Sequence, residues 1–340
     1  MATMKALVLK EIKSAFEIQE VEKPQPKAGE VLVKIVAAAF NHRDLWIQKG
    51  QYAGLKFPIT LGSDGSGTIE AIGENTNSHL IGRKVVINPS QNWGNNPKAQ
   101  SKEFKILGLP ESGTFAEYVC VPADNVLMKP SFLSFEETAA LPLAGLTAYR
   151  ALFSRAKTTK EDTVLISGVG GGVALFAMQF ALAIGAKVFV TSGSDAKIAK
   201  AKKLGAAGGI NYNKENWHKK LLEESGGFDV IIDSAAGESF NNLIDVAKPG
   251  ARIAFYGGTN GNINNLNPQK IFWKQLSLLG STMGTAEEFN AMIQFVEEYQ
   301  IKPVLDGVFA FSEAQKAIER MAQKEQFGKI VLSFNQAPAR

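Results

Sequence analysis

A glycine-rich turn between a strand and a helix is the segment whose residue types and spacing point most directly to chemistry. Residues 163–166 are typical of an apolar strand, and residues 168–174 (GVGGGVA) lead into an apolar helix that runs to Ile184. Glycines in such a turn let the backbone approach a pyrophosphate, whose charge lies against the free amides and positive dipole of the helix N-terminus. The pattern therefore predicts a dinucleotide site. Its residues are expected to be Gly170, Gly171, Gly172 and Val173.

The glycine motif can be read in two registers. Counted from Gly168, the third glycine of the G-x-G-x-x-G pattern falls on Val173, and counted from Val169 it falls on Ala174. The second register is favoured because alanine is small enough for close packing of the helix on the strand. A tight structural turn without a ligand is the alternative interpretation.

The end of the next predicted strand indicates which nicotinamide cofactor binds. NAD sites carry an Asp or Glu about twenty residues after the glycine turn, but residues 191–194 (TSGS) offer small hydroxyl side chains there. Without a carboxylate a 2′-phosphate is not repelled, so NADPH is favoured over NADH. Asp195 comes three residues later and leaves NADH as the alternative, unless it caps the following helix. The expected phosphate ligands are Ser192, Ser194, Lys197 and Tyr212.

The elements that position these residues alternate between apolar strands and amphipathic helices. This alternation with short links predicts a parallel, doubly wound α/β sheet. The expected strands are 163–166, 187–191, 209–212, 229–233, 251–256 and 276–281. The expected helices are 174–184, 196–204, 216–224, 239–247 and 286–299, preceded by a helical stretch from the Ser134 N-cap to about residue 154.

The first 127 residues have a different sequence pattern, with short predicted strands bounded by Gly, Pro or Asn. Expected strands are 5–10, 17–21, 30–39, 68–72, 84–87 and 115–121, which is the signature of a β-rich unit with a partly rolled sheet. A helix at 311–321 and a strand at 328–334 are expected to rejoin this unit. The predicted domains are therefore 1–127, with 300–340 returning to it, and 128–299.

Length and composition suit a two-domain globular protein. The chain has 340 residues, of which 45% are apolar and 21% charged, and its net charge of +4 comes without a long basic tract. Nucleic-acid binding has no support, and no apolar run approaches the length of a membrane span. The one cysteine, Cys120, excludes an internal disulfide and a multi-thiolate metal site, which suits the cytoplasm.

Five stretches in order along the chain carry a resemblance to a known family. They are residues 38–44 (AAFNHRD), 61–67 (LGSDGSG), 113–119 (GTFAEYV), 139–149 (AALPLAGLTAY) and the glycine turn. Together they resemble the medium-chain dehydrogenase/reductase superfamily, especially its quinone oxidoreductase and zinc-free alcohol-dehydrogenase-like branches. The resemblance implies a β-rich GroES-like catalytic domain beside a Rossmann cofactor-binding domain.

The resemblance also bears on metal binding. Zinc members hold a catalytic metal on a Cys, a His and a second Cys, with a Glu after the His. The matching positions in this sequence are Asn41, Ser63, Leu143 and Asp64. Neither thiolate nor imidazole is present among them, and residues 88–113, which match a lobe with a second zinc on four cysteines, contain no cysteine. Both metals are predicted absent, and His42 and His79 are interpreted as hydrogen-bonded or partly exposed side chains rather than substitute ligands.

Without a Lewis acid, hydride addition to a conjugated carbonyl is easier than oxidation of a simple alcohol, because the developing charge is delocalised. We therefore expect hydride transfer from NADPH to an acceptor such as a quinone. The resemblance implies that Asn41 lies beside the nicotinamide, and Tyr52 is the candidate proton donor or substrate clamp, with a core or interface tyrosine as the alternative. Further residues expected to line the cofactor site are Thr147, Gly257, Gly258 and Ser281.

Two alternative functions are considered, and a homodimer is the expected oligomeric state. The acceptor can instead be an enone, enal or enoyl thioester, and a protein of another class would bind NADPH without catalysis. Family members commonly dimerise through the strand that matches residues 276–281, and Leu276, Leu278 and Leu279 suit such edge-to-edge pairing. A homodimer acting on a small molecule is expected.

Overall fold

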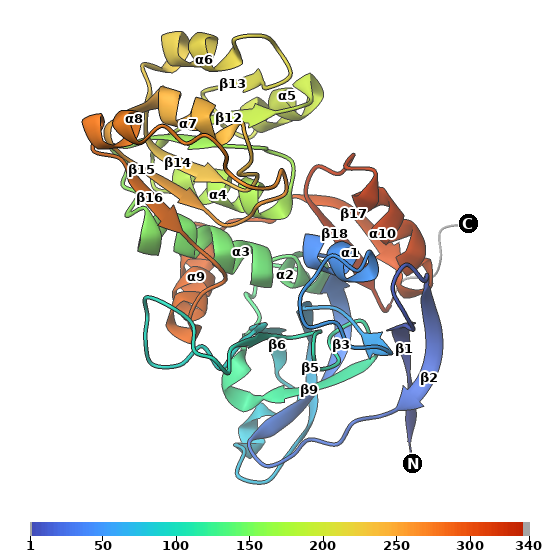
Figure 1. The fold of residues 1–340 in the computed structure, drawn as a ribbon. Coiled ribbons are helices and arrows are strands. Elements are labelled where there is room, and N and C mark those ends of the chain that lie inside the picture. Colours follow the sequence, from blue (N-terminus) through green and yellow to red (C-terminus); the bar gives the residue numbers. More distant parts are fainter. Residues whose placement is uncertain (1, 336–340) are drawn as a thin grey trace. The chain divides into compact units, whose positions relative to one another are not determined.

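A computed structural model describes residues 2–335 (Figure 1). The chain divides into two compact units, one of Met1–Ala144 with Gly284–Arg340 and one of Gly145–Met283. Residues 128–144 and 284–299, which the sequence analysis placed in the cofactor-binding domain, group with the first unit. One reason is that α2 (Phe135–Ala139) packs on strands β3 (Glu30–Ala39) and β5 (Asp64–Ile72).

The unit of residues 145–283 is built on a six-stranded parallel sheet (Figure 1). Its strands are β11 (Thr163–Ile166), β12 (Lys187–Ser192), β13 (Gly208–Asn211), β14 (Phe228–Asp233), β15 (Ala247–Phe255) and β16 (Ser277–Gly280). They lie in the order β13-β12-β11-β14-β15-β16, which reverses direction between β11 and β14. This is the strand order of the Rossmann fold, in which ligands bind beyond the carboxyl ends of the strands at the reversal. The predicted fold class is confirmed.

Helices cover this sheet and bury its apolar side chains. They are α4 (Gly172–Ala183), α5 (Asp195–Lys203), α6 (Trp217–Ser225), α7 (Phe240–Val246) and α8 (Pro268–Trp273). Trp217 of α6 and Phe240 of α7 pack with Phe228 and Ile231 of β14 in one buried cluster. Strands covered in this way read as continuous apolar runs, which is why the sequence identified them well.

The helical stretch predicted from Ser134 to residue 154 is divided into three pieces. Helix α2 begins at the predicted N-cap, where Ser134 Oγ accepts a hydrogen bond from the Glu137 amide at 3.1 Å. Helix α3 (Pro142–Tyr149) starts at a proline, which cannot continue the preceding helix but suits the first helical position. A π-helical segment, η3 (Arg150–Arg155), follows. The prediction of one continuous helical stretch was therefore wrong.

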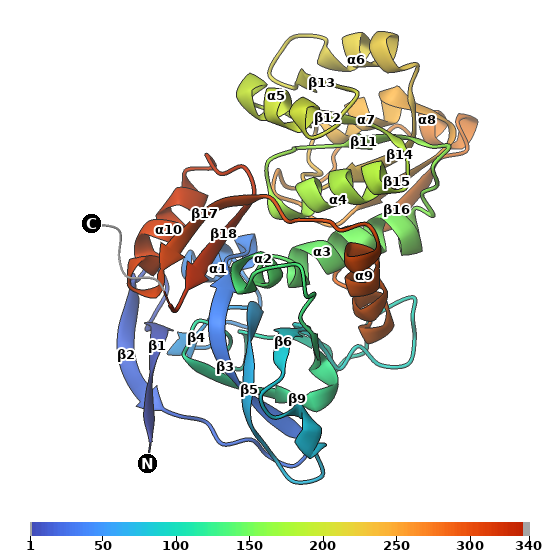
Figure 2. The same ribbon diagram turned by 180° about the vertical axis from the view of Figure 1, so that it is seen from behind.

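The first unit is β-rich, as predicted, and its main sheet runs in the order β10-β6-β5-β3-β18-β17, with β9 also paired to β3. Figure 2 shows its last strands and α10 beside the N-terminal strands. The further strands are β1 (Thr3–Leu9), β2 (Phe16–Glu22), β4 (Ile59–Thr60), β6 (Lys84–Ile87), β7 (Ser90–Gln91), β8 (Lys105–Ile106), β9 (Tyr118–Pro122), β10 (Val126–Met128), β17 (Leu305–Ala310) and β18 (Lys329–Ser333). The helices are α1 (His42–Gln48), α9 (Ala286–Glu298) and α10 (Ala314–Ala322), with 3₁₀ turns η1 (Ser78–Leu80), η2 (Ala123–Asn125) and η4 (Phe311–Glu313).

The sequence analysis did not predict α1, α8 and β17, nor the short strands β4, β7, β8 and β10. Strand β17 contains Asp306 and Gly307, which interrupt the apolar pattern, and α1 and α8 are each shorter than the helices that periodicity reveals. Within residues 2–335, none of the helices combines the length and the apolar character that crossing a membrane requires.

Candidate active site

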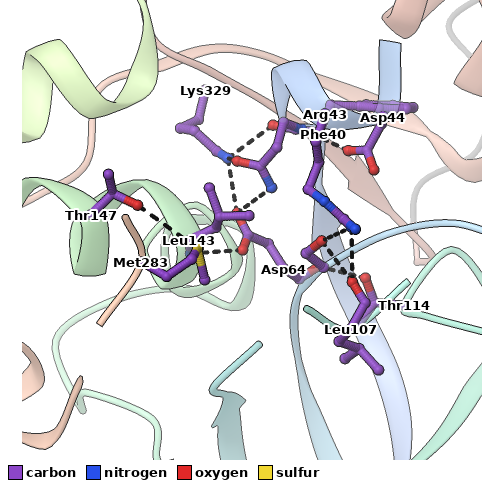
Figure 3. Close-up of polar contacts among 12 residues, drawn as sticks. Phe40, Arg43, Asp44, Asp64, Leu107, Thr114, Leu143, Thr147, Met283 and Lys329 are labelled. Atoms are coloured by element: carbon purple, nitrogen blue, oxygen red, sulfur yellow. Dashed lines mark hydrogen bonds and ion pairs between the residues drawn. The ribbon is translucent and has the colours of Figure 1, made fainter. Parts of the chain in front are cut away.

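Three strands of the first unit bring polar side chains to one edge of the sheet. Strands β5 and β18 both run antiparallel to β3, with Ala39 opposite Asp64 and also opposite Val331. The end of β3 and the beginnings of β5 and β18 therefore meet. Asn41 follows β3, Asp64 opens β5 and Lys329 opens β18, so residues far apart in the sequence lie together (Figure 3).

Lys329 binds both of the other residues. Its Nζ donates hydrogen bonds to the Phe40 carbonyl at 2.8 Å, to Asn41 Oδ1 at 2.7 Å and to Asp64 Oδ2 at 2.9 Å. The side chains of Lys329 and Asp64 are 4% and 0% exposed, so this ion pair is shielded from water. Asn41 Nδ2 also donates to Asp64 Oδ2 at 2.9 Å. The sequence analysis did not identify Lys329, because its burial depends on a carboxylate that is distant in the sequence.

The other carboxylate oxygen of Asp64 binds a backbone amide at the start of a helix. Asp64 Oδ1 accepts a hydrogen bond of 2.8 Å from the backbone amide of Leu143, in the first turn of α3. A carboxylate at a helix N-terminus satisfies a free amide and complements the helix dipole. Asp64 is thus held by partners on both oxygens.

The residues present do not fit a catalytic zinc. Asn41, Asp64 and Leu143 come together, but Leu143 contributes only its backbone amide, and the Asn41 amide oxygen already accepts from Lys329. Ser63 turns elsewhere, since its hydroxyl donates to the Leu107 carbonyl at 2.8 Å. Among residues 2–335 no group of three or more His, Cys, Asp or Glu side chains could hold a metal ion. A lone carboxylate paired with an ammonium lacks the thiolate or imidazole donors of a tetrahedral zinc site.

Tyr52 lies against a buried arginine. The Arg43 guanidinium, on α1, is 5% exposed and donates from Nη1 to Ser63 Oγ at 2.7 Å and to the Leu107 carbonyl at 3.0 Å. Its Nε lies 3.5 Å from the Tyr52 hydroxyl, and its Cζ lies 5.2 Å from the centre of the Tyr52 ring. The recorded polar contact of Tyr52 is therefore with Arg43, and its proposed role in proton donation stays a prediction.

Asp44 is a fully buried carboxylate beside this cluster. Its Oδ2 accepts the Asn41 backbone amide at 2.8 Å, while its Oδ1 has no hydrogen-bond partner among the residues that the structure describes. Burial raises the pKa of Asp44 to about 6, against the opposing effect of the Arg43 charge. Asp44 is the N3 residue of the capping box that begins α1, the helix that also carries Arg43.

In the second unit, the glycine turn has the conformation that the pattern predicts. Gly168 and Gly170 have φ values of 67° and 134°, a region in which residues with a Cβ are strained. Gly171 is the N-cap of α4, and Ala174 is 3% exposed where it packs, as expected for the favoured register. The Val169 amide donates to the Thr191 carbonyl at 2.7 Å, which ties the turn to β12.

The four predicted phosphate ligands lie near this turn and one another. A Cβ placed on Gly170 would lie 2.9 Å from Lys197 Cδ and 3.4 Å from its Nζ, so the lysine passes over the turn. A Cβ placed on Gly193 would lie 2.9 Å from the Tyr212 hydroxyl. Ser194 Oγ accepts the Lys197 amide at 3.4 Å, and Ser192 Oγ accepts the Ser194 amide at 3.4 Å.

Asp195, whose carboxylate left NADH as the alternative cofactor, lies at the start of α5. It is the first residue of α5, and the N-cap is Ser194 rather than Asp195. Its carboxylate forms an exposed ion pair with Lys214 at 3.2 Å. The interpretation of Asp195 as a helix cap was therefore wrong by one residue.

A buried carboxylate that the sequence analysis missed lies where the strand order reverses. Asp233, at the end of β14, accepts hydrogen bonds from the Ser167 hydroxyl and from the amides of Ala235 at 3.2 Å and Ala236 at 2.8 Å. Burial raises its pKa. Asp233 therefore joins the end of β11 to the loop after β14, and an acid ending an apolar strand was the available signal.

The remaining predicted cofactor residues follow the strands or lie on α3. Thr147 is 5% exposed and its hydroxyl lies 3.9 Å from Met283 Sδ. At Gly257 a Cβ would lie 2.5 Å from the Ser234 carbonyl oxygen, whereas at Gly258 it would lie 4.0 Å from the Gly261 carbonyl oxygen. Ser281 Oγ is buried and has no hydrogen-bond partner among residues 2–335, and its role toward a cofactor stays a prediction.

Two family profiles match the chain. The profile described as alcohol dehydrogenase GroES-like domain matches residues 27–131, in the β-rich unit. The profile described as zinc-binding dehydrogenase matches residues 172–298, beginning at the first residue of α4. Each profile corresponds to one of the two expected domains.

Known proteins match nearly the whole chain. A zinc-type alcohol dehydrogenase-like protein of Schizosaccharomyces pombe is 37% identical over 93% of this chain and 94% of its own. A protein of the same description from Leptosphaeria maculans is 34% identical over 94% of both chains. The crystal structure of an NAD-dependent alcohol dehydrogenase is 35% identical, with a TM-score of 0.92 over 98% of this chain and 100% of that one.

Relatives of lower identity are named for other acceptors. Acryloyl-coenzyme A reductase of Sulfurisphaera tokodaii is 29% identical over 97% of this chain and 99% of its own. Quinone oxidoreductase of Mus musculus is 28% identical over 91% of this chain and 90% of its own. The relatives therefore do not share one substrate class.

Proposed function

The chain belongs to the medium-chain dehydrogenase/reductase superfamily and is an NAD(P)-dependent oxidoreductase, and from this premise we propose that it reduces conjugated carbonyl compounds such as quinones with NADPH and without zinc. The observation that carries the proposal is the cluster of Asn41, Asp64 and Lys329. In this cluster an amide stands at a position that matches a zinc ligand, and an ammonium binds its oxygen. Such a site favours acceptors that delocalise charge by themselves.

The side chains beyond β12 support NADPH over NADH. Bound NADPH would supply the hydride. Lys197 lies over the glycine turn and offers a positive charge, and Ser192, Ser194 and Tyr212 offer hydroxyl groups nearby. Charge-assisted hydrogen bonds of this kind are the strongest that a phosphate can receive from a protein. The carboxylate of Asp195 forms an exposed ion pair with Lys214.

On the acceptor side, Asn41 is the residue suited to orient a carbonyl. Its amide nitrogen carries two N–H donors, one of which is given to Asp64. The second is available to an acceptor oxygen. In this proposal the proton that completes the reduction comes from Tyr52, whose hydroxyl Arg43 holds, or from water.

An enoyl thioester is the second candidate acceptor. The relative named acryloyl-coenzyme A reductase supports it, since it matches nearly the full length of both chains. The same delocalisation argument applies to a thioester conjugated with a double bond. A comparison of turnover between the thioester and the corresponding simple enone separates the two.

The test is NADPH consumption against a panel of acceptors. Quinones, enones, enoyl thioesters and simple aldehydes are each offered with NADPH and with NADH. Turnover of quinones with a preference for NADPH is expected. Turnover of simple aldehydes alone contradicts the proposal, and a change of NADPH fluorescence without turnover of any acceptor would indicate a cofactor-binding protein that is not an enzyme.

We also propose that the chain forms a homodimer through the edge of β16. The strand ends its sheet and is only partly buried at Leu278 and Leu279, and the adjacent Phe272 and Trp273 are 54% and 79% exposed. An open edge beside exposed aromatic side chains suits pairing with a second copy. Sedimentation of the wild type and of Leu279→Lys tests this, with a dimer expected only for the wild type.

A further inference from the structure

The ammonium of Lys329 has the hydrogen-bonding pattern of a bound cation. Its three N–H groups meet three oxygen atoms, on Phe40, Asn41 and Asp64, at 2.7 to 2.9 Å (Figure 3). An uncharged amine has two N–H groups and a lone pair, so one of these oxygens would face a lone pair. The site is therefore built for a positive charge.

Two of the positions that match the zinc ligands of related enzymes, Asn41 and Leu143, lie around this charge. Asn41 accepts a hydrogen bond from the ammonium, and Leu143 donates its amide to Asp64, which matches the Glu after the His ligand. Each of these three residues is therefore bound to the ammonium or to its counter-ion. Arg43, the other buried cation of the cluster, is bound instead to Ser63 and Leu107.

We infer that the Lys329 ammonium is a fixed cation of the catalytic centre and that it positions the Asn41 amide. The inference rests on the proposed zinc-free function. With its oxygen on Lys329 and its nitrogen on Asp64, the Asn41 side chain is held at both ends. Lys329 is thus a positioning residue, since it acts through Asn41.

The experiment removes the ammonium and supplies it again from solution. Lys329→Ala deletes three carbons and the nitrogen, which propylammonium replaces. Melting temperature is measured without substrate or cofactor, with propylammonium or with sodium at equal ionic strength. We expect the melting temperature of Lys329→Ala to be lower than that of the wild type, and to rise again, with saturation, in propylammonium but not in sodium. Propylammonium should have no effect on the wild type or on Lys102→Ala, which changes an exposed lysine of the same unit.

Turnover gives a second reading of the same variants. We expect kcat of Lys329→Ala to fall at least ten-fold, with KM for NADPH unchanged, and to recover in propylammonium. If Lys329→Ala does not fold, Lys329→Met combined with Asp64→Asn removes both charges together. That pair is expected to fold with the ten-fold loss of kcat, because Asn41 is no longer held.

Two results overturn the inference. One is a Lys329→Ala protein, or the neutral double variant, with wild-type kcat and no response to propylammonium. The other is one tightly held zinc per wild-type chain that Asp64→Asn abolishes. The melting experiment needs no substrate, so the two claims can fail separately. Rescue by propylammonium without turnover of quinones would contradict the proposed function and support the role of Lys329. Quinone turnover without rescue would support the proposed function and contradict the role of Lys329.

Discussion

The two units build their polar sites in opposite ways. In the β-rich unit, Lys329, Asn41 and Asp64 bind one another, which leaves one side-chain N–H of Asn41 for an acceptor, and little exposed surface remains on them. In the parallel-sheet unit, the predicted cofactor ligands include Tyr212, which is 46% exposed, and Ser281, whose buried hydroxyl has no partner within residues 2–335. A closed site holds a fixed charge in place, whereas an open set of donors is completed by a ligand. Substitutions should therefore affect stability in the first unit and cofactor affinity in the second.

The largest expected effect is on the closed cluster. Lys329→Met leaves the Asp64 carboxylate buried without a counter-charge, and breaking a buried ion pair in this way costs about 3–5 kcal/mol of unfolding free energy. Adding Asp64→Asn should recover most of that loss. Denaturant unfolding of the single, double and wild-type proteins measures it. A loss below about 1 kcal/mol, typical of an exposed pair, would show that the cluster is not closed.

Asp44 gives the closed cluster a pH dependence. Its pKa in the folded protein, about 6, lies above the ordinary value of 3.8, so the native state binds more protons than the unfolded state. Its contribution to stability is complete below about pH 4 and is lost as the pH rises through 6. A shift of roughly two units corresponds to about 3 kcal/mol. The free energy of unfolding of the wild type and of Asp44→Asn is measured between pH 4 and 8. This loss of stability with rising pH should appear only in the wild type. Equal slopes would mean that Asp44 is not buried as a carboxyl group.

Substitutions in the open site of the second unit should change the affinity for NADPH and the preference between NADPH and NADH. Lys197→Ala removes a charge-assisted contact to a 2′-phosphate, worth about 1.5–3 kcal/mol, so KM for NADPH should rise roughly 10- to 100-fold. Values for NADH should not change, because NADH lacks that phosphate. Lys219→Ala, an exposed lysine of α6, is the control. An equal loss with both cofactors would argue against a phosphate contact.

The smallest effect is expected at Tyr52. Tyr52→Phe removes one hydroxyl beside Arg43, and a single neutral hydrogen bond is worth about 0.5–1.5 kcal/mol. If the hydroxyl supplies the proton, kcat should fall roughly two- to ten-fold while the melting temperature changes little. Unchanged kcat would assign Tyr52 to packing alone.

The sequence predicted the parallel sheet more fully than the site. Strand β11 has the predicted bounds, because a strand buried on both faces is an unbroken apolar run between polar turns. The helix after Ser134 was less well predicted, since apolar periodicity continues through the break at Pro142. Strand β5 begins at Asp64, four residues before its predicted start, because Gly65 and Gly67 disguise its pattern.

Local motifs identified the glycine turn, but no local motif could identify the buried cluster. The turn and the residues after β12 lie within a few tens of residues of one another, so their chemistry is visible in one short stretch. Lys329 is 265 residues from Asp64, and only the pairing of β18 and β5 with β3 brings them together. A lysine in an isolated segment also reads as a surface residue, because its burial depends on the distant carboxylate.

The most direct test of the account is whether the enzyme needs a metal. NADPH-dependent quinone reduction is measured before and after exhaustive dialysis against a zinc chelator, and again after zinc is added back. Because Lys329 supplies the positive charge at the centre of the cluster, we predict the same kcat and KM in all three states. Loss of turnover on chelation and its return with zinc would contradict the account.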